Sequence, residues 1–189
     1  MPLLQIVIAS TRPGRIGRAV GEWFAEEARA HGSFDVELVD LAEVALPFLD
    51  EPRHPRLRRY EHDHTRAWSA TIDRGDAYAF VMPEYNHGYS APLKNAVDFL
   101  WHEWNDKPVA LVGYGGVSGG LRSTTAFKPV LGAVRLRLAA EVPIPFVSQH
   151  LQDGQIVAND PMVQGAKAAL AELARLHPAL QLLRAGDAA

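Results

Sequence analysis

Strand-like apolar runs alternate with amphipathic, helix-like stretches along the chain, and this alternation constrains the fold more than any other feature of the sequence. Residues 3–9, LLQIVIA, form an apolar run rich in branched side chains that stops at a polar cluster containing Gly and Pro. Such a run is typical of a strand buried on both faces of a sheet. Between Arg15 and about Ala30, apolar residues recur at helical spacing against charged ones. Because connections between parallel strands are right-handed, repeated alternation predicts an α/β fold with a parallel sheet and helices on both faces.

The other expected elements continue this alternation to the end of the chain. Further strands are expected at residues 34–41, 77–82 and 108–116, with a short one near 141–145. Further helices are expected at about 61–74, over 93–104, around Pro129, which interrupts its helix, and from the N-cap residue Asp160 onward. A chain of 189 residues is long enough for one core, so we expect a single domain over residues 1–189. Its last residues, from about 180 to 189, are expected to form a frayed, flexible tail.

Composition excludes several classes of function. The formal charge of −3 gives no reason to expect nucleic acid or an anionic membrane surface as a partner. The absence of cysteine excludes disulfides, thiolate nucleophiles and thiolate-bound metal centres, so redox chemistry would need a borrowed cofactor. The N-terminus lacks a basic signal region, and no apolar run reaches the roughly 18 residues of a membrane span. We therefore expect a cytoplasmic protein without a membrane span that acts on small molecules.

The loop after the first strand, ASTRPGRIG, has the composition of a phosphate site. The hydroxyls of Ser10 and Thr11, the guanidinium groups of Arg12 and Arg15, and the amides of the following helix start can surround a dianionic phosphate. The alternative is that this cluster only caps the helix and solvates the turn.

Known phosphate motifs with other functions do not fit this loop. Gly14, Gly17 and Gly21 lack the G-x-G-x-x-G spacing of a dinucleotide site, and no Walker A sequence is present. The cysteine that a phosphatase of similar topology would use is also missing. The loop is therefore expected to hold a phosphate without cleaving it.

Two more loops follow strands and are expected at the same edge of the sheet. In PEYNHG, residues 83–88, backbone amides and Asn86 can hydrogen-bond the edge of a flat polar ring while Tyr85 supplies apolar contact. In GYGGVSGG, residues 113–120, glycines allow a ligand to approach the backbone closely, and the amides can stabilise negative charge on a reduced ring. Parallel α/β sheets bind ligands at the carboxyl ends of their strands, so three such loops together predict a ligand site.

The chain resembles the NADPH-dependent FMN reductases and the related quinone and azo reductases, most specifically in PEYNH…LKNA.D.L from Pro83 onward. This resemblance spans nearly the whole chain. It implies a flavodoxin-like three-layer sandwich whose five-stranded parallel sheet has the order 2-1-3-4-5. It also implies an FMN site. The residues that correspond to the family's FMN-binding segments, together with Thr11 from the loop analysis, are Ser10, Thr11, Arg12, Arg15, Ile16, Gly17, Pro83, Glu84, Tyr85, Asn86, Gly115, Gly116, Val117 and Ser118. Ala9 stands where the family usually has glycine.

The resemblance also implies an enzyme. NADPH or NADH would reduce bound FMN, and a small acceptor such as a quinone, an azo compound, a free flavin or a metal oxyanion would then take two electrons in a ping-pong sequence. No side chain is expected to act as acid, base or nucleophile, and no metal site is expected. Family members are typically homodimers or homotetramers, so Trp101 and Trp104 are expected either at a subunit interface or in the core.

Several alternatives remain open at the level of sequence. An electron carrier of the flavodoxin type and a flavin-based redox sensor share the expected fold and cofactor. A nucleotide-binding domain without flavin is favoured only by the helix-start phosphate site and by Asp40 at the end of the second strand. His54, His62 and His64 lie in a Pro- and Arg-rich segment that is interpreted as a solvated lid rather than a metal site. Arg58 and Arg59 in the same segment are candidates for binding the 2′-phosphate of NADPH.

Overall fold

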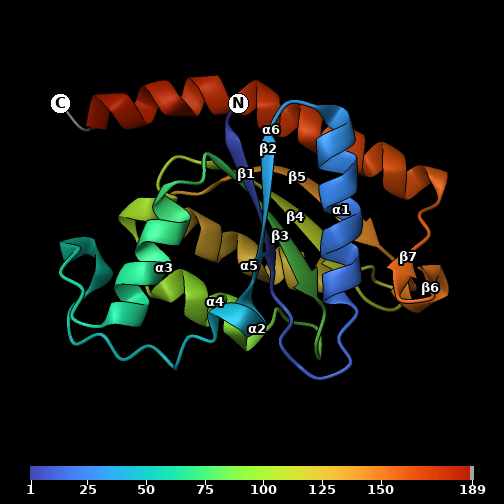
Figure 1. Ribbon diagram of the computed structural model, residues 1–189, viewed down its shortest axis with the longest axis horizontal. Coiled ribbons are helices and arrows are strands. Elements are labelled where there is room, and N and C mark those ends of the chain that lie inside the picture. Colours follow the sequence, from blue (N-terminus) through green and yellow to red (C-terminus); the bar gives the residue numbers. More distant parts are fainter. Residues whose placement is uncertain (188–189) are drawn as a thin grey trace.

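The computed structural model describes residues 1–187 and confirms the predicted α/β architecture (Figure 1). Five parallel strands form one sheet in the order β2-β1-β3-β4-β5. Their bounds are β1 (Leu3–Ile8), β2 (Asp35–Asp40), β3 (Ala77–Pro83), β4 (Pro108–Tyr114) and β5 (Arg137–Ile144). The strand order reverses direction between β1 and β3, which is where such sheets bind ligands.

Helices cover both faces of the sheet. On one face lie α1 (Gly17–His31) and the long C-terminal helix α6 (Asp160–Asp187), which cross the sheet side by side at the right and top of Figure 1. On the other face lie α3 (Asp63–Asp73), α4 (Ala91–Asp98) and α5 (Leu121–Ala133). A short helix, α2 (Leu41–Val44), follows β2, and three 3₁₀ turns occupy Pro55–Leu57, His102–Trp104 and Val147–His150. The antiparallel pair β6 (Leu151–Gln152) and β7 (Gln155–Ile156) precedes α6.

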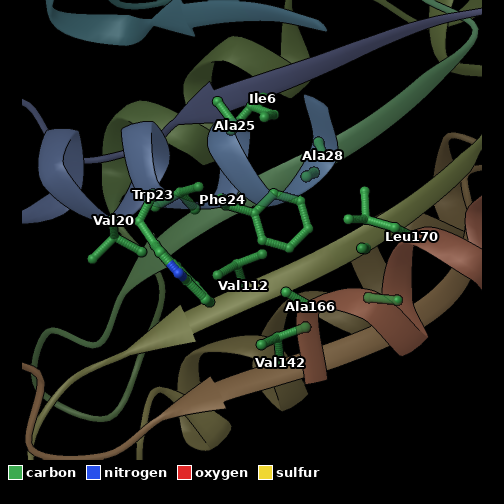
Figure 2. Packing of buried hydrophobic residues seen from close by; sticks show 14 of the residues in the cluster. Ile6, Val20, Trp23, Phe24, Ala25, Ala28, Val112, Val142, Ala166 and Leu170 are labelled. Carbon is green, nitrogen blue, oxygen red and sulfur yellow. The ribbon is translucent and has the colours of Figure 1, made fainter. Parts of the chain in front are cut away.

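Each face of the sheet has its own apolar core. Figure 2 shows the first core, in which Phe24 and Trp23 of α1 meet Val112 of β4 and Leu170 of α6. The second core, under α3, α4 and α5, is aromatic and is centred on Trp104, which packs edge-to-face against Tyr78 and Phe80. Burial on both faces explains why every residue of β3 and β4 is buried and why neither strand alternates.

Some element boundaries differ from the sequence-based prediction. The last strand, β5, begins at Arg137 rather than near residue 141, and Pro129 is accommodated within α5 without ending it. Where a frayed tail was expected, α6 continues through Asp187 and Leu180 is buried; residues 188 and 189 of the expected tail lie outside the described residues. Ala and Leu are strong helix formers, which accounts for the extension. No helix within residues 1–187 is long and apolar enough to cross a membrane.

The Pro-rich segment between α2 and α3 is held against the domain at several points. Asn95 of α4 accepts a hydrogen bond from the Leu49 amide and donates one to the Pro47 carbonyl, at 3.0 and 2.7 Å. The Glu51 carboxylate accepts from the amides of Glu61 and His62. The segment is therefore attached to the domain by specific hydrogen bonds, which a merely solvated lid would not make.

The charged and aromatic side chains near this segment have structural partners. Arg58 pairs with Asp73 and with the buried Glu103, at 3.2 and 3.3 Å, which leaves it poorly placed to bind a coenzyme phosphate. Trp104 is 1% exposed and belongs to the core, whereas Trp101 is partly buried and donates to the Ala133 carbonyl. No group of three potential metal ligands occurs among the described residues.

Candidate functional site

A cleft opens at the carboxyl ends of β1, β3 and β4. These strand ends point toward the lower part of Figure 1. The cleft has a volume of about 150 Å³ and brings together side chains from the three loops that were predicted from sequence. Its lining consists of Arg12, Ile16, Pro83, Glu84, Tyr85, Tyr114, Gly115 and Val147. All of these except Tyr114 and Val147 belong to the predicted set.

Ser10 lies directly after β1, beside the cleft. Its side chain is fully buried, and its hydroxyl oxygen makes no hydrogen bond of normal geometry in the described part of the chain, although the Tyr114 hydroxyl lies close enough to interact with it. Leaving a buried hydroxyl unpaired costs about 1–3 kcal/mol, so such a group is usually satisfied by something that binds. The N-terminus of α1 beside it also lacks a side-chain cap, because its N-cap residue is Ile16. An anion seated here would satisfy both the hydroxyl and the helix-start amides.

Gly17 makes this approach possible. A β-carbon at Gly17 would lie 2.2 Å from the Ser10 hydroxyl oxygen and 2.5 Å from the Tyr114 hydroxyl oxygen. Any larger residue would therefore displace both hydroxyls. The glycine is required by close approach of two polar side chains rather than by an unusual backbone angle.

The two arginines of the first loop have different surroundings. Arg12 is exposed and lines the cleft, so its guanidinium is available to a ligand. Arg15 instead donates to the buried carboxylate of Asp40 at 2.6 Å, and Arg18 of α1 approaches the same carboxylate at 3.4 Å. Asp40 also caps α2 by accepting from the Ala42 amide. Asp40 therefore has a structural role, and the alternative of a ribose-binding acid loses its support.

The segment after β3 folds into a tight hairpin turn. The amides and carbonyls of Tyr85 and Gly88 bond each other reciprocally at 3.0 and 2.9 Å. The two residues between them, Asn86 and His87, have positive φ values of 49° and 65°. Asn tolerates this conformation better than most residues, which gives Asn86 a conformational role at the tip of the turn. Its side chain is exposed and does not line the cleft, so its hydrogen bond to a ring stays a prediction.

Glu84 connects this segment to the glycine-rich loop. Its carboxylate accepts hydrogen bonds from the Ser118 hydroxyl at 2.6 Å, from the Arg122 amide at 3.1 Å and from the Arg122 guanidinium at 3.1 Å. Burial acts to raise the pKa of Glu84, but these donors outweigh it and leave the pKa below its usual value. The carboxylate is therefore ionised at neutral pH and fully engaged by the protein.

The glycine-rich loop after β4 is compact and has a fixed backbone. Gly119 and Gly120 have positive φ values of 60° and 85°, and a β-carbon at Gly120 would lie 2.4 Å from the Tyr114 nitrogen. Within residues 1–187, the amides of residues 116–118 have no hydrogen-bond partner, although Gly116 and Val117 are exposed and do not line the cleft. These amides are available to a ligand that lies over the loop.

Two lining residues were not predicted from the sequence. Tyr114, at the end of β4, is 6% exposed, and burial raises its pKa to about 12 although the neighbouring Ser10 hydroxyl acts to lower it, so the phenol stays protonated. Val147 reaches the cleft from the segment after β5, where its amide donates to the Gly115 carbonyl. The signal for Tyr114 was its position at the carboxyl end of a buried strand, whereas nothing in the local sequence marks Val147.

A second, larger cavity lies beside the cleft. It has a volume of about 520 Å³ and is lined almost entirely by apolar groups of α2, α4 and the segment that follows α2. Thr11 lines this cavity instead of the cleft. The cavity offers few free polar groups to a ligand. Both ends of the Asn95 amide, for example, already bond the backbone at residues 47 and 49. The cavity carries no charge that would fix a phosphate.

Comparison with solved structures first identifies the class. The fold matches that of FerB, a flavoenzyme NAD(P)H:(acceptor) oxidoreductase from Paracoccus denitrificans, with a TM-score of 0.73 at 18% sequence identity, over 95% of this chain and 98% of that one. At this identity the match concerns the fold alone, and it places the chain among flavodoxin-like α/β proteins with the strand order seen here.

Sequence comparison then identifies the family. Residues 1–150 match the family described as NADPH-dependent FMN reductase, and the chain belongs to that family. It is 39% identical over 144 residues to an NAD(P)H-dependent FMN reductase of Schizosaccharomyces pombe, covering 75% of this chain and 72% of the relative. It is 34% identical over 156 residues to an NAD(P)H-dependent FMN reductase of a Nectria species, covering 78% and 77%. The resemblance stated from the sequence is confirmed, and family membership implies FMN and NAD(P)H as cofactors.

Proposed function

We propose that the protein is an NAD(P)H-dependent FMN oxidoreductase that passes two electrons to a small acceptor. Bound FMN supplies the redox chemistry by taking a hydride from NAD(P)H and giving two electrons to the acceptor in a ping-pong sequence. The observation that carries the proposal is the unpaired, fully buried Ser10 hydroxyl at the uncapped start of α1, beside a cleft lined by all three predicted loops.

The residues of the cleft fit the parts of FMN. Ser10, Arg12 and the first amides of α1 are proposed to hold the phosphate, with Gly17 leaving room for the hydroxyls. Pro83 and Tyr85 on one side, and the backbone of residues 115–118 on the other, are proposed to border the ring. Glu84 and Ser118 are proposed to position the loops rather than to contact FMN, because their side chains already bond each other. Arg15 pairs with Asp40 through one terminal nitrogen but leaves its buried Nε without a partner among the described residues, so it stays a proposed phosphate ligand. No side chain is required as acid, base or nucleophile.

The small volume of the cleft supports two proposals: that the flavin ring stays partly exposed to solvent, and that a second subunit completes the site. A cleft of about 150 Å³ is smaller than the roughly 300–1,000 Å³ of complete ligand sites, so one protomer can enclose only part of the cofactor. Phe48, which lines the apolar cavity, and its neighbour Leu49 are 87% and 43% exposed. We propose that a second copy of the chain covers this region in a homodimer or homotetramer. A flavin ring that is exposed to solvent can pass electrons to varied oxidants. The proposed acceptor is therefore a small molecule such as a quinone, an azo compound, a flavin or a metal oxyanion.

The experiment that tests this function is the visible spectrum of protein reconstituted with FMN and desalted, before and after anaerobic addition of NADPH. Retention of the flavin band and its bleaching by NADPH are the expected results. Retained flavin that NADPH does not reduce would instead favour the alternative of an electron carrier or redox sensor. Loss of all flavin on desalting, with no binding in a titration, would contradict the proposed function.

A further inference from the structure

We propose that Glu84 and Arg122 form a positioning ion pair that fixes the glycine-rich loop and balances charge beside the flavin ring. The inference rests on the proposed FMN site and assigns a specific task to two residues within it. Glu84 is thereby a positioning residue rather than a ligand of FMN, and Arg122, which does not line the cleft, becomes part of the site's electrostatics.

The Glu84 carboxylate accepts three hydrogen bonds that together hold the glycine-rich loop in place, and we call this arrangement the brace. Its carboxylate oxygens accept from the Ser118 hydroxyl, the Arg122 amide and the Arg122 guanidinium, at distances between 2.6 and 3.1 Å. Its own amide donates to the Tyr114 carbonyl at 3.0 Å, which fixes Glu84 to the end of β4 as well. One side chain therefore connects the end of β3, the glycine-rich loop and the first turn of α5.

The brace also substitutes for a missing helix cap. The N-cap residue of α5 is Gly120, which has no side chain to bond the first amides. The Glu84 carboxylate bonds the Arg122 amide instead, and a negative charge at a helix start interacts favourably with the helix dipole. Hydrogen bonds to an ionised group contribute more than neutral ones, so the loop position depends on this carboxylate.

The two charges of the ion pair differ in how deeply they are buried. The Glu84 side chain is 7% exposed, whereas that of Arg122 is 48% exposed, so the carboxylate lies at the cleft wall and its counter-ion lies outside it. Reduction of a flavin places negative charge on the ring, and nearby protein charges tune this step. An unpaired Glu84 carboxylate would oppose that charge, and an unpaired Arg122 guanidinium would favour it.

The test compares the FMN midpoint potential and the FMN dissociation constant in three variants at pH 8. Arg122→Gln should shift the potential to more negative values, and Glu84→Gln should shift it to more positive values. The double variant should return to nearly the wild-type potential because it carries neither charge. FMN affinity should fall about tenfold in Glu84→Gln and in the double variant, because both lose the carboxylate that holds the loop, and should fall less in Arg122→Gln, which keeps the bonds from the Ser118 hydroxyl and the amide of residue 122. Arg122→Lys should keep the wild-type potential, since it preserves the charge.

A second ion pair, between α5 and β5, provides the matched control. Glu141 accepts from Thr124 at 2.7 Å and pairs with Lys128 at 2.6 Å, and none of these three residues lines the cleft. Glu141→Gln should leave both potential and affinity unchanged, and thermal unfolding of each apoprotein checks that the variants fold. Wild-type FMN binding with equal or same-signed shifts in the two single variants would overturn the inference and leave the FMN site intact. Failure of wild-type protein to bind FMN would overturn the proposed function and this inference together.

Discussion

At the scale of single residues, the site is defined by polar groups that the fold buries and leaves unpaired. Ser10 is such a group, whereas Ser123 is equally buried but donates to the Pro83 carbonyl at 3.0 Å. The two serines lie near the same loops and differ only in whether the apoprotein satisfies them. This contrast supports the proposal that Ser10 serves a ligand and Ser123 serves stability.

Ser10→Ala should therefore weaken FMN binding about 10- to 100-fold, the value of one hydrogen bond to a charged group. Stability of the apoprotein should stay constant or rise by up to about 1 kcal/mol, because an unpaired hydroxyl is removed. Ser123→Ala, the matched control, should instead lose about 1 kcal/mol. Urea unfolding of both apoproteins and fluorescence titration with FMN measure these effects. Equal loss of stability in the two variants would contradict the role given to Ser10.

Lys107 shows a different consequence of burial. Its ammonium group donates to the carbonyls of Ile72 and Asp73 and to the Tyr78 hydroxyl, at 3.1, 3.0 and 2.9 Å. Burial lowers the pKa of Lys107 to about 7, with the positive charge of Arg184 acting in the same direction and the acidic residues Asp73, Asp76 and Glu103 acting against it. The unfolded chain, with an ordinary lysine pKa near 10.4, therefore binds more protons than the folded chain between about pH 7 and 10.

Wild-type stability should consequently rise with pH relative to Lys107→Met, by up to about 1.4 kcal/mol per pH unit. The measurement is the free energy of unfolding of both proteins at pH 7, 8 and 9, where Tyr78 is not yet titrating because burial raises its pKa. The free energy of unfolding of the wild type should increase relative to that of Lys107→Met at each step from pH 7 to 8 and from pH 8 to 9. A constant difference over this range would show that the pKa of Lys107 is not depressed in the folded state.

At the scale of elements, the loops at the carboxyl ends are shaped by backbone requirements that their sequences partly display. The glycine-rich loop turns back on β4 so tightly that Gly120 touches the Tyr114 backbone. At Gly116 in the same loop, an added β-carbon would meet no atom within 4 Å, and the backbone there has no positive φ. The loop therefore contains glycines that geometry requires, Gly119 and Gly120, and one that it does not, Gly116.

Gly120→Ala should destabilise the protein by about 2–3 kcal/mol, because it adds a strained φ and a clash with backbone that cannot move aside. Gly116→Ala should change stability by less than about 0.5 kcal/mol. Thermal or chemical unfolding of the two variants provides a direct comparison. A Gly120→Ala protein as stable as wild type would mean that the loop can adopt another conformation.

For the whole molecule, the apolar periodicity and the crossover rule predicted the layers and the edge of the sheet that forms the cleft, whereas the strand order was implied by the family resemblance. The sequence could not predict pairings made by tertiary structure. Glu84 lines the cleft as expected, but its bonds to Ser118 and Arg122 were not foreseen, and neither was the pairing of Arg15 with Asp40. Val147 reaches the cleft only because β5 ends beside it.

The proposed assembly also belongs to this scale. The protomer has a mass of 20.7 kDa, and the cavity beside its cleft borders the exposed apolar side chain of Phe48. Sedimentation velocity at about 10 μM protein with FMN present should give a species of two or four protomers, as a closed symmetric assembly requires. A single species with the protomer mass under these conditions would contradict the shared site.

The central claim is that the loop after β1 binds the FMN phosphate at Ser10, Arg12 and the start of α1. The most direct measurement compares the dissociation constants of FMN and riboflavin, which differ only in that phosphate. We expect FMN to bind at least about 100-fold more tightly, as two charge-assisted hydrogen bonds would provide, and Ser10→Ala with Arg12→Ala to remove most of this difference. Equal affinity for FMN and riboflavin in the wild-type protein would show that this loop does not bind the phosphate.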